Sequence, residues 1–240
     1  CIIIPVYDHA QGIGPTVEAV RAAGYPVLLV DDGSSAACAQ VLDALVAAHP
    51  TQLRLLRRPE NGGKGAAMAD GFTAAAAAGH SHALQIDADG QHNAQDIPRF
   101  IEQAAAQPQA VICGVPIYDQ SVPKSRLYGR YATHIWVWIN TLSLQIRDSM
   151  CGFRVYPLQP TLQVFAEEHV GARMEFDTEI IVRLFWRGLP VVNLPTAVRY
   201  PIDGVSHFAL WADNLRISRM HARLFFSMLW RLPALLARRL

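Results

Sequence analysis

Long uninterrupted apolar stretches are missing from this sequence, although hydrophobic residues make up 51% of its 240 residues. A transmembrane helix needs roughly 18 or more consecutive apolar residues. The longest candidate, Ile135 to Ile146, is shorter and is interrupted by Asn140, Thr141, Ser143 and Gln145. We therefore expect a buried or interfacial helix there and no membrane-spanning segment.

Charged residues are also scarce, at 17%, and the formal net charge is only +1. No strong overall field therefore favours nucleic acid as a partner. The few cysteines, Cys1, Cys38, Cys113 and Cys151, lack any zinc-like spacing. We interpret them as reduced thiols of a cytosolic protein. Residues 1–6 resemble a strand and carry no basic leader, so no signal peptide is expected.

Short apolar runs alternate with helix-like segments through the first half of the chain. The expected strands are 1–6, 27–30, 53–56, 84–86 and 110–114, and the expected helices are 16–23, 36–48, 66–78 and 94–106. This alternation predicts βαβ units and a mostly parallel, doubly wound sheet covered by helices on both faces. The fold class is therefore α/β.

The expected elements lengthen after Gly114. They are a helix over 124–144, an extended segment over 152–156, a helix over 175–186 and a strand over 191–195. We expect one catalytic domain over residues 1–212, followed by a separate helix over 213–240.

The final segment is basic and amphipathic, with six arginines and no acid after Asp213. On a helical wheel the apolar side is formed by Ile217, Met220, Leu224 and Met228, and the basic side by Arg216, Arg219 and Arg223. We expect Pro233 to break this helix. Such a helix suits an anionic membrane surface, and the alternative is that its apolar side packs on the catalytic domain.

The stretch from His82 to His92 carries the strongest chemical signal. A short apolar run leads directly into Asp87 and Asp89, and strands of an open α/β sheet present their ligands at their carboxyl ends. Two carboxylates followed by Gln91 suit a divalent cation such as Mg²⁺ or Mn²⁺. The alternative is a surface turn, because Asp and Gly are common in turns.

Two other loops have polar compositions that suit a nucleotide. In the turn from Asp31 to Ser34, the carboxylates can accept hydrogen bonds from a base or a ribose, or the turn can simply cap the next helix. The loop from Asn61 to Gly65 is similar in composition to a phosphate loop but lacks the Walker spacing, which argues against an NTPase.

Five motifs in order resemble one known family. They are Ile-Ile-Pro-Val-Tyr (3–7), Val-Asp-Asp-Gly-Ser (30–34), Asn-Gly-Gly-Lys-Gly-Ala-Ala (61–67), Ile-Asp-Ala-Asp-Gly-Gln-His (86–92) and Asp-Ser-Met-Cys-Gly-Phe-Arg (148–154). Together they resemble the inverting family 2 glycosyltransferases of the GT-A fold, above all the dolichol- and polyprenol-phosphate branch. The resemblance covers about residues 2–208.

This resemblance implies a UDP- or GDP-sugar donor and a divalent metal. It assigns donor binding to Pro5, Tyr7, Asp31, Asp32, Lys64, Asp87, Ala88 and Asp89, and metal binding to Asp87, Asp89 and Gln91. A metal at Asp87 and Asp89 would stabilise the departing nucleoside diphosphate as a Lewis acid, which makes Asp89 catalytic. A lipid-phosphate acceptor is already a nucleophile, so it would need no protein base.

The acceptor side is expected to form from segment 148–154 and the helix that carries Asp177 and Glu179. Because these two carboxylates are two residues apart on a helix, only one can point squarely into a site. Either is a candidate base. Arg154 is a candidate clamp for the diphosphate or an acceptor phosphate.

Further basic residues are assigned to the acceptor. Arg126 and Arg130 share a helix face and either meet an anionic head group or form a solvated surface, while Arg199 precedes a loop that contains His207 and folds over the donor site in the family.

Two departures from the lipid-phosphate branch concern the acceptor. Val115 and Pro116 stand where that branch has part of a Gly-Ser-Arg motif, and Ser206-His207 replaces a Ser-Lys pair.

We therefore expect a metal-dependent inverting glycosyltransferase, cytoplasmic and peripheral at the inner face of the cytoplasmic membrane, with a lipid-linked acceptor. One alternative keeps the donor and uses a non-phosphate lipid or hydroxyl acceptor. Another is a nucleotidyltransferase or a catalytically silent nucleotide-binding module.

Overall fold

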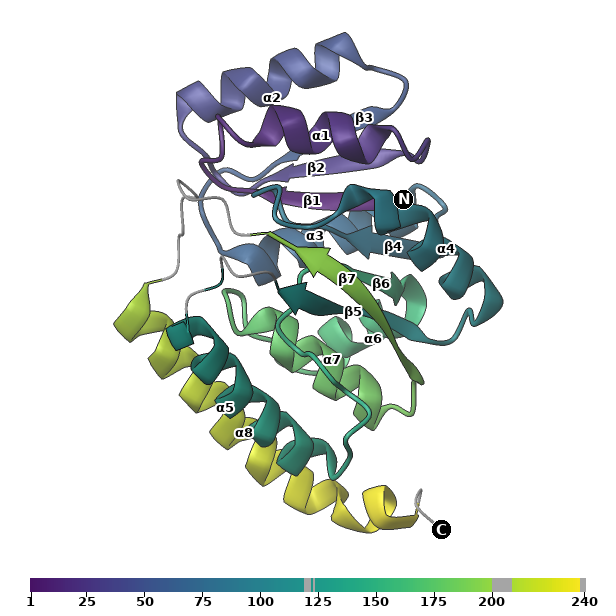
Figure 1. Cartoon of the computed structure of the whole chain (residues 1–240), viewed down its shortest axis with the longest axis vertical. Helices are drawn as coiled ribbons and strands as arrows, with labels where there is room; N and C mark the ends of the chain where they lie inside the picture. Colours follow the sequence, from purple (N-terminus) through teal and green to yellow (C-terminus); the bar gives the residue numbers. More distant parts are fainter. Residues whose placement is uncertain (119–121, 123, 200–208, 238–240) are drawn as a thin grey trace.

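The computed structural model describes residues 1–118, 122, 124–199 and 209–237. Within them a seven-stranded sheet has the order β3-β2-β1-β4-β6-β5-β7 and carries helices on both faces (Figure 1). The strands are β1 (Ile2–Val6), β2 (Val27–Asp31), β3 (Leu53–Arg57), β4 (His82–Gln85), β5 (Val111–Tyr118), β6 (Arg154–Pro157) and β7 (Val191–Val198). The helices are α1 (Ile13–Arg21), α2 (Ala36–Ala48), α3 (Lys64–Ala77), the short 3₁₀ helix η1 (Ala94–Asp96), α4 (Ile97–Ala106), α5 (Lys124–Thr141), α6 (Leu158–Glu167), α7 (Phe176–Trp186) and α8 (Leu210–Ala237).

The expected doubly wound, mostly parallel sheet is confirmed. Strands β1 to β4 pair in parallel, as do β5 and β7, and only β6 runs antiparallel to its neighbours β4 and β5. The register aligns Val6 at the end of β1 with Asp31 at the end of β2. The carboxyl ends of β1, β2 and β4 therefore meet at one edge of the sheet, where ligand sites of such folds form.

Alternation along β1 supplies both hydrophobic cores. Ile3 faces a core shared with α3, α5, α6, α7 and α8, whereas Ile2 and Ile4 face a core shared with α1, α2 and α4. Because a strand covered on both faces is apolar at every position, this central strand appears in the sequence as a continuous β-branched run.

Element boundaries differ from the expected ones mainly in the second half. Helix α2 occupies the expected residues, but β5 and β7 continue three or more residues further than expected, and α6 was not anticipated. Pro160 lies in the first turn of α6, where a backbone N–H has no partner within the helix, so it is compatible with the helix.

Helix α8 continues through Pro233, so the expected break there is wrong. Proline removes the donor for the carbonyl four residues earlier, at Leu229. Both Pro233 and Leu229 are exposed, so that carbonyl can be hydrated instead.

The expected apolar side of α8 packs on the rest of the protein. Met220, Leu224 and Met228 are buried in the core that α7 also lines, and α8 lies beside α5 (Figure 1). None of the described helices has the length and apolarity needed to cross a membrane.

Two arginines on the expected basic side of α8 form ion pairs within the protein. Arg223 donates to the buried Glu179 at 2.6 Å, and Arg216 donates to the buried Asp213 at 2.8 Å. These two guanidinium groups therefore neutralise the protein's own carboxylates, which weakens the predicted attraction of this basic side to an anionic membrane surface.

Candidate active site

The segment after β4 leaves the sheet at the point where the neighbouring strand β1 has no further backbone N–H group to pair with it. Ile86 N donates to Ile3 O at 3.1 Å, and the next β1 residue on that side is Pro5, which lacks an N–H. The ladder between β1 and β4 cannot continue past this proline. Residues 87–92 therefore form a loop at the carboxyl edge of the sheet, as the sequence predicts.

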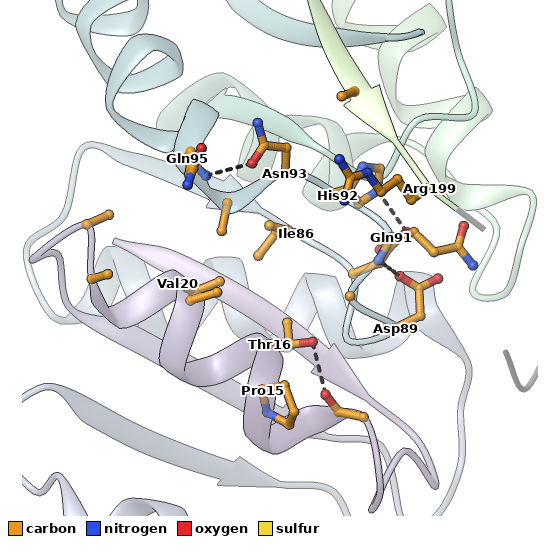
Figure 2. A pocket seen from close by; sticks show the side chains of 18 of the residues that line it. Pro15, Thr16, Val20, Ile86, Asp89, Gln91, His92, Asn93, Gln95 and Arg199 are labelled. Carbon is orange, nitrogen blue, oxygen red and sulfur yellow. Dashed lines mark hydrogen bonds and ion pairs between the residues drawn. The ribbon is translucent and has the colours of Figure 1, made fainter. Parts of the chain in front are cut away.

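A cavity of about 950 Å³ opens beside this loop, between α1, the start of α4 and the end of β7 (Figure 2). Asp87, Asp89, Gln91 and Arg199 all line it. Gln91 N donates to Asp89 Oδ1 at 3.0 Å, and Arg199 N donates to Gln91 O at 3.0 Å. Four residues predicted for the site, one of them more than a hundred positions away, are thus brought together.

Other predicted donor residues lie around this edge. Ala88 is buried, and its carbonyl accepts a hydrogen bond from Thr16 Oγ1 at 3.2 Å. Tyr7 follows β1 and is half-buried. His92, which the sequence places with Gln91 just beyond the two carboxylates of the expected cation site, lines the same cavity, and its ring lies 5.7 Å from that of Phe153. Donor contacts by Pro5, Tyr7 and Ala88 stay predictions.

Asp87 is held by cationic and polar neighbours on several sides. Lys64 Nζ lies 2.7 Å from its Oδ1, and His92 Nε2 lies 3.7 Å from its Oδ2. Burial alone would raise the pKa of Asp87, but Lys64 and His92 hold it well below its usual range. Burial likewise opposes the charge on Lys64, yet the carboxylates of Asp177 and Asp87 raise the pKa of this lysine.

Asp89 has the opposite electrostatic environment. Burial and the adjacent charge of Asp87 raise its pKa. Asp87 and Asp89 could hold a divalent cation, which would offset both effects because it supplies positive charge and prefers hard oxygen ligands such as carboxylates.

Asp87 and Asp89 therefore fit a cation that takes two protein ligands. Within the described part of the chain, no group of three or more His, Cys, Asp or Glu is arranged to hold a metal ion. Mg²⁺ commonly uses one or two carboxylates and completes its shell with phosphate and water oxygens. Gln91, the third predicted ligand, lines the same cavity.

Asp177, in the first turn of α7, is connected to this loop through Lys64. Its Oδ2 lies 2.6 Å from Lys64 Nζ, and its Oδ1 accepts a hydrogen bond from Gln85 Nε2 at 2.8 Å. The side chain is only 8% exposed. Both carboxylate oxygens are thus engaged by protein donors, which disfavours the predicted role of Asp177 as a base.

Gln85 is a site residue that the sequence reasoning missed. It is fully buried in β4, and its Oε1 accepts a hydrogen bond from Tyr156 OH at 3.0 Å. The sequence did contain a signal for it, namely an amide side chain inside an otherwise apolar strand. A buried polar group of this kind needs hydrogen-bond partners, which points to a polar cluster around it.

Glu179 is fully buried, and its carboxylate is saturated. It is bonded to Arg183 Nε at 2.9 Å, to Arg223 NH2 at 2.6 Å and to Gly171 N at 2.9 Å. A carboxylate enclosed by two guanidinium groups cannot reach an acceptor, so the prediction of Glu179 as a base is wrong.

Arg154 is also fully buried, which overturns the prediction that it clamps a phosphate. Its NH1 donates to Tyr156 OH at 3.1 Å and to the Asp177 carbonyl at 2.8 Å, and its NH2 donates to the Ser149 carbonyl at 3.2 Å. Arg154 therefore fixes the start of α7 relative to β6 from inside the protein.

The two carboxylates after β2 hold neighbouring loops. Asp31 accepts from Arg57 Nε at 2.8 Å and from Ser34 N at 3.0 Å. Asp32 accepts from Gly62 N at 3.0 Å and from Gly63 N at 2.7 Å. The loop that resembles a phosphate loop thus directs these N–H groups at Asp32. Nucleoside binding by Asp31 and Asp32 stays a prediction.

Arg130 points into the protein and not toward solvent. Its Nε and NH2 donate to the two oxygens of Asp148 at 2.6 and 2.7 Å, and His134 Nε2 lies 3.3 Å from the same carboxylate. Burial would raise the pKa of Asp148, but His134 and Arg130 hold it well below its usual range. The alternative of a solvated basic face is therefore wrong for Arg130, and the engagement of its guanidinium by Asp148 disfavours the predicted contact with an anionic head group of the acceptor.

The two remaining acceptor candidates are not described at side-chain level. Arg126 belongs to the first turn of α5, but its side chain lies outside the described part of the structure, and His207 lies outside the described residues altogether.

The model of one protein family, Glycosyl transferase family 2, matches residues 1–165. The chain belongs to this family. That family 2 assignment agrees with the motif resemblance and with the position of Asp87 and Asp89 at the end of β4.

Similar proteins include lipid-phosphate glycosyltransferases by name. The chain of this family 2 member is 26% identical to a dolichyl-phosphate beta-glucosyltransferase of Dictyostelium discoideum over 84% of this chain and 63% of that protein. It is 25% identical to a polyprenol monophosphomannose synthase of Mycolicibacterium smegmatis over 90% of this chain and 82% of that protein. The chain thus spans less than two thirds of the length of the dolichyl-phosphate relative.

Solved structures confirm the GT-A fold. Glucosyl-3-phosphoglycerate synthase from Mycobacterium tuberculosis, in complex with Mn²⁺ and UDP-glucose, superposes with a TM-score of 0.69 at 13% identity, over 95% of this chain and 77% of that chain. At this identity the likeness shows the fold alone.

Proposed function

We propose that this family 2 glycosyltransferase transfers a sugar, with inversion, from a UDP- or GDP-sugar to a lipid-linked phosphate and depends on Mg²⁺ or Mn²⁺. One observation carries the proposal: Asp87 and Asp89 lie in the loop just after the end of β4, and both line a cavity. Related proteins named dolichyl-phosphate beta-glucosyltransferase and polyprenol monophosphomannose synthase support the acceptor class.

On the donor side, Asp87 and Asp89 would hold the divalent cation, which as a Lewis acid stabilises the charge that develops on the departing nucleoside diphosphate. Lys64 lies at the same place, and its ammonium adds a fixed positive charge beside that diphosphate. Gly152 lies so close to the Asp87 carboxylate that a larger residue at this position would displace the carboxylate. These residues orient the leaving group before the reaction begins.

On the acceptor side, the hydrogen bonds of the two candidate bases, Asp177 and Glu179, favour an acceptor that is a phosphate. Glu179 is enclosed by Arg183 and Arg223, and both oxygens of Asp177 are bonded to protein donors. A hydroxyl acceptor needs a base within hydrogen-bond reach, whereas a phosphate monoester is ionised at neutral pH. The engagement of both carboxylates therefore favours the lipid-phosphate acceptor over the hydroxyl alternative.

An exposed apolar surface lies on the neighbouring helices α5 and α8, and we call it the α5–α8 apolar face. Its members are large hydrophobic side chains that remain exposed, namely Tyr128, Tyr131, Ile135, Trp136 and Ile139 on α5 and Trp211, Leu215, Phe226, Leu229, Trp230 and Leu236 on α8. Trp211 and Trp230 are 88% and 89% exposed. The two helices lie side by side (Figure 1).

We assign a lipid bilayer surface to this face. Tryptophan and tyrosine favour the boundary between headgroups and acyl chains, and an apolar patch of this kind is unusual on a protein surrounded by water. Residues on the inner side of α5, such as Arg130, contact Asp148 in the loop that also carries Gly152. The face would thus bring the site to a lipid-linked acceptor, with the protein peripheral at the inner, cytoplasmic face of the membrane.

The donor half of the proposal can be tested by thermal unfolding with UDP- and GDP-sugars, each with and without Mn²⁺. A ligand that binds only the folded protein raises its apparent stability. One nucleotide class should raise the Tm only when Mn²⁺ is present, and Asp89→Asn should remove the shift. A folded sample that shifts with none of the donors would contradict the proposed donor site.

A further inference from the structure

Lys64 occupies the space between two carboxylates that belong to different parts of the fold. Its Nζ lies 2.7 Å from Asp87 Oδ1, in the loop after β4, and 2.6 Å from Asp177 Oδ2, on α7. The lysine itself begins α3. One ammonium group thus bridges a predicted metal ligand and a carboxylate whose other oxygen is bonded to Gln85.

The Asp177 end of this bridge is rigidly held. Its other oxygen is bonded to Gln85 Nε2, Gln85 Oε1 accepts from Tyr156 OH, and Tyr156 accepts from Arg154 NH1. Arg154 in turn donates to the Asp177 carbonyl at 2.8 Å, which closes a ring of buried hydrogen bonds. Such a ring leaves Asp177 without a second position to adopt.

The Asp87 end is attached to a loop and borders the cavity. The Asp87 side chain is 26% exposed, compared with 8% for that of Asp177, although the Oδ1 atom of Asp87 that contacts Lys64 is itself buried. Of the two carboxylates that contact Lys64, that of Asp87 is therefore the more accessible, because its side chain lines the cavity.

We propose that Lys64 is an internal cation that neutralises Asp87 until a divalent cation replaces it, and that Asp177 then retains the ammonium beside the diphosphate. This inference rests on the proposed function, because it takes Asp87 as a metal ligand. A divalent cation and an ammonium group repel one another at one carboxylate. The metal alone binds weakly in consequence, and a nucleoside diphosphate, whose negative charge interacts with both cations, makes its binding strong.

The two roles of Lys64 lead to opposite effects of its removal. Without the ammonium, no positive charge of the protein competes at Asp87 with a cation held by Asp87 and Asp89, so the affinity for metal alone increases. The affinity for a nucleoside diphosphate decreases, because one of its two positive partners is lost. The dependence of metal binding on nucleotide therefore becomes weaker.

The test measures Mn²⁺ binding without donor or acceptor, from the electron paramagnetic resonance signal of free Mn²⁺. Lys64→Met should bind Mn²⁺ at least about tenfold more tightly than the wild type. Adding Asp87→Asn to this variant should remove the gain. Lys64→Gln, which keeps a donor for Asp177, should show the same gain if Lys64→Met does not fold.

A matched control is Arg187→Met, which removes a cation from Glu167 and Glu168, two residues of α6 and its C-terminal end. It should leave Mn²⁺ binding unchanged. If Lys64→Met and Lys64→Gln bind Mn²⁺ no more tightly than the wild type, the inference is overturned.

A second arm separates this failure from failure of the proposed function. Mn²⁺ binding by the wild type is measured again with UDP or GDP present, alongside Asp89→Asn. Asp89-dependent binding without any gain in the Lys64 variants overturns only the internal cation. No Asp89-dependent binding under any condition overturns the metal site itself, and the internal cation with it.

Discussion

Gly152 lies directly against the carboxylate of Asp87, so closely that a Cβ built on the glycine would overlap both carboxylate oxygens. The loop that follows Asp148 thereby sets the position of a residue more than sixty positions earlier in the chain. We expect Gly152→Ala to displace Asp87 and lower kcat/KM more than about tenfold, with a stability cost of about 1–3 kcal/mol for overpacking.

The matched control for this substitution is Gly129→Ala, because a Cβ at Gly129 has no atom within 4 Å. It lies in a helix, so we expect unchanged activity in detergent and a stability gain of no more than about 1 kcal/mol. Full activity of Gly152→Ala would contradict the steric account of the Asp87 position.

Asp148 anchors the same loop to α5. It accepts two bonds from Arg130 and two backbone N–H bonds, from Met150 and Cys151. Removing one partner of a buried ion pair leaves the other charge uncompensated, so Asp148→Ala should lower the free energy of unfolding by about 3–5 kcal/mol in urea titrations.

The comparison for Asp148 is Glu18→Ala, which removes an exposed carboxylate paired with Arg21. Its cost should stay below about 1 kcal/mol. The pKa of Asp148 is lowered on folding, so its contribution to stability is present above about pH 4 and is lost as the pH falls further. Equal costs for the two variants would contradict the assignment of Asp148 as a buried anchor.

His221 belongs to α8 and stacks on Trp136 of α5, with the ring centroids 6.0 Å apart. Burial lowers the pKa of His221 to about 4, an effect that Glu179 partly offsets. Between about pH 6.5 and pH 4 the unfolded chain therefore binds a proton that the folded protein does not. Stability present above pH 6.5 should be lost over this range, by on the order of 2–3 kcal/mol.

The variant His221→Phe keeps an aromatic ring and removes this titration. Urea unfolding of both proteins at pH 7 and pH 4.5 should show a smaller loss of stability in the variant, by about 2 kcal/mol. Any hydrogen bond lost from Asn140 is lost at both pH values and cancels in the difference. Identical pH dependence of the two proteins would exclude His221 as the cause.

Membrane binding should depend on the apolar side chains more than on the arginines, because Arg216 and Arg223 already neutralise internal carboxylates. The combined change Ile135→Ser, Phe226→Ser and Trp230→Ser should weaken sedimentation with uncharged phosphatidylcholine vesicles at least about tenfold. Arg219→Glu should have a visible effect only with anionic vesicles at low salt.

The control for vesicle binding is Val46→Ser on α2, at the other end of the molecule in Figure 1. It should bind vesicles as the wild type does. If the triple variant binds vesicles normally but changes from dimer to monomer, the α5–α8 apolar face contacts a second copy of the chain and not a bilayer.

Local sequence patterns correctly predicted the helices and strands whose buried and exposed sides follow from their own residues. The β-branched run of β1, the helix Ala36–Ala48 and the position of Asp87 at a strand end all follow from hydrophobic periodicity and turn chemistry. The break at Pro233 was a local rule that did not hold, because the exposed side of α8 can hydrate the carbonyl left without a donor.

Partners of charged residues could not be predicted in the same way. Glu179 meets Arg223 across 44 positions, and Lys64 meets Asp177 across 113. Periodicity tells which face a side chain occupies but not which distant element covers that face. The sequence therefore placed Glu179 and Arg154 near the chemistry, whereas tertiary packing encloses both of them in the interior.

The most direct test of the central claim is sugar transfer to polyprenyl phosphate in detergent, measured by mass spectrometry with the nucleotide-sugars and Mn²⁺. We predict that one donor yields a glycosylated polyprenyl phosphate and one equivalent of nucleoside diphosphate, with the anomeric configuration inverted, and that Asp89→Asn loses at least about 99% of this activity. Folded protein that releases no nucleoside diphosphate from any donor, or full turnover by Asp89→Asn in a chelator, would contradict the account.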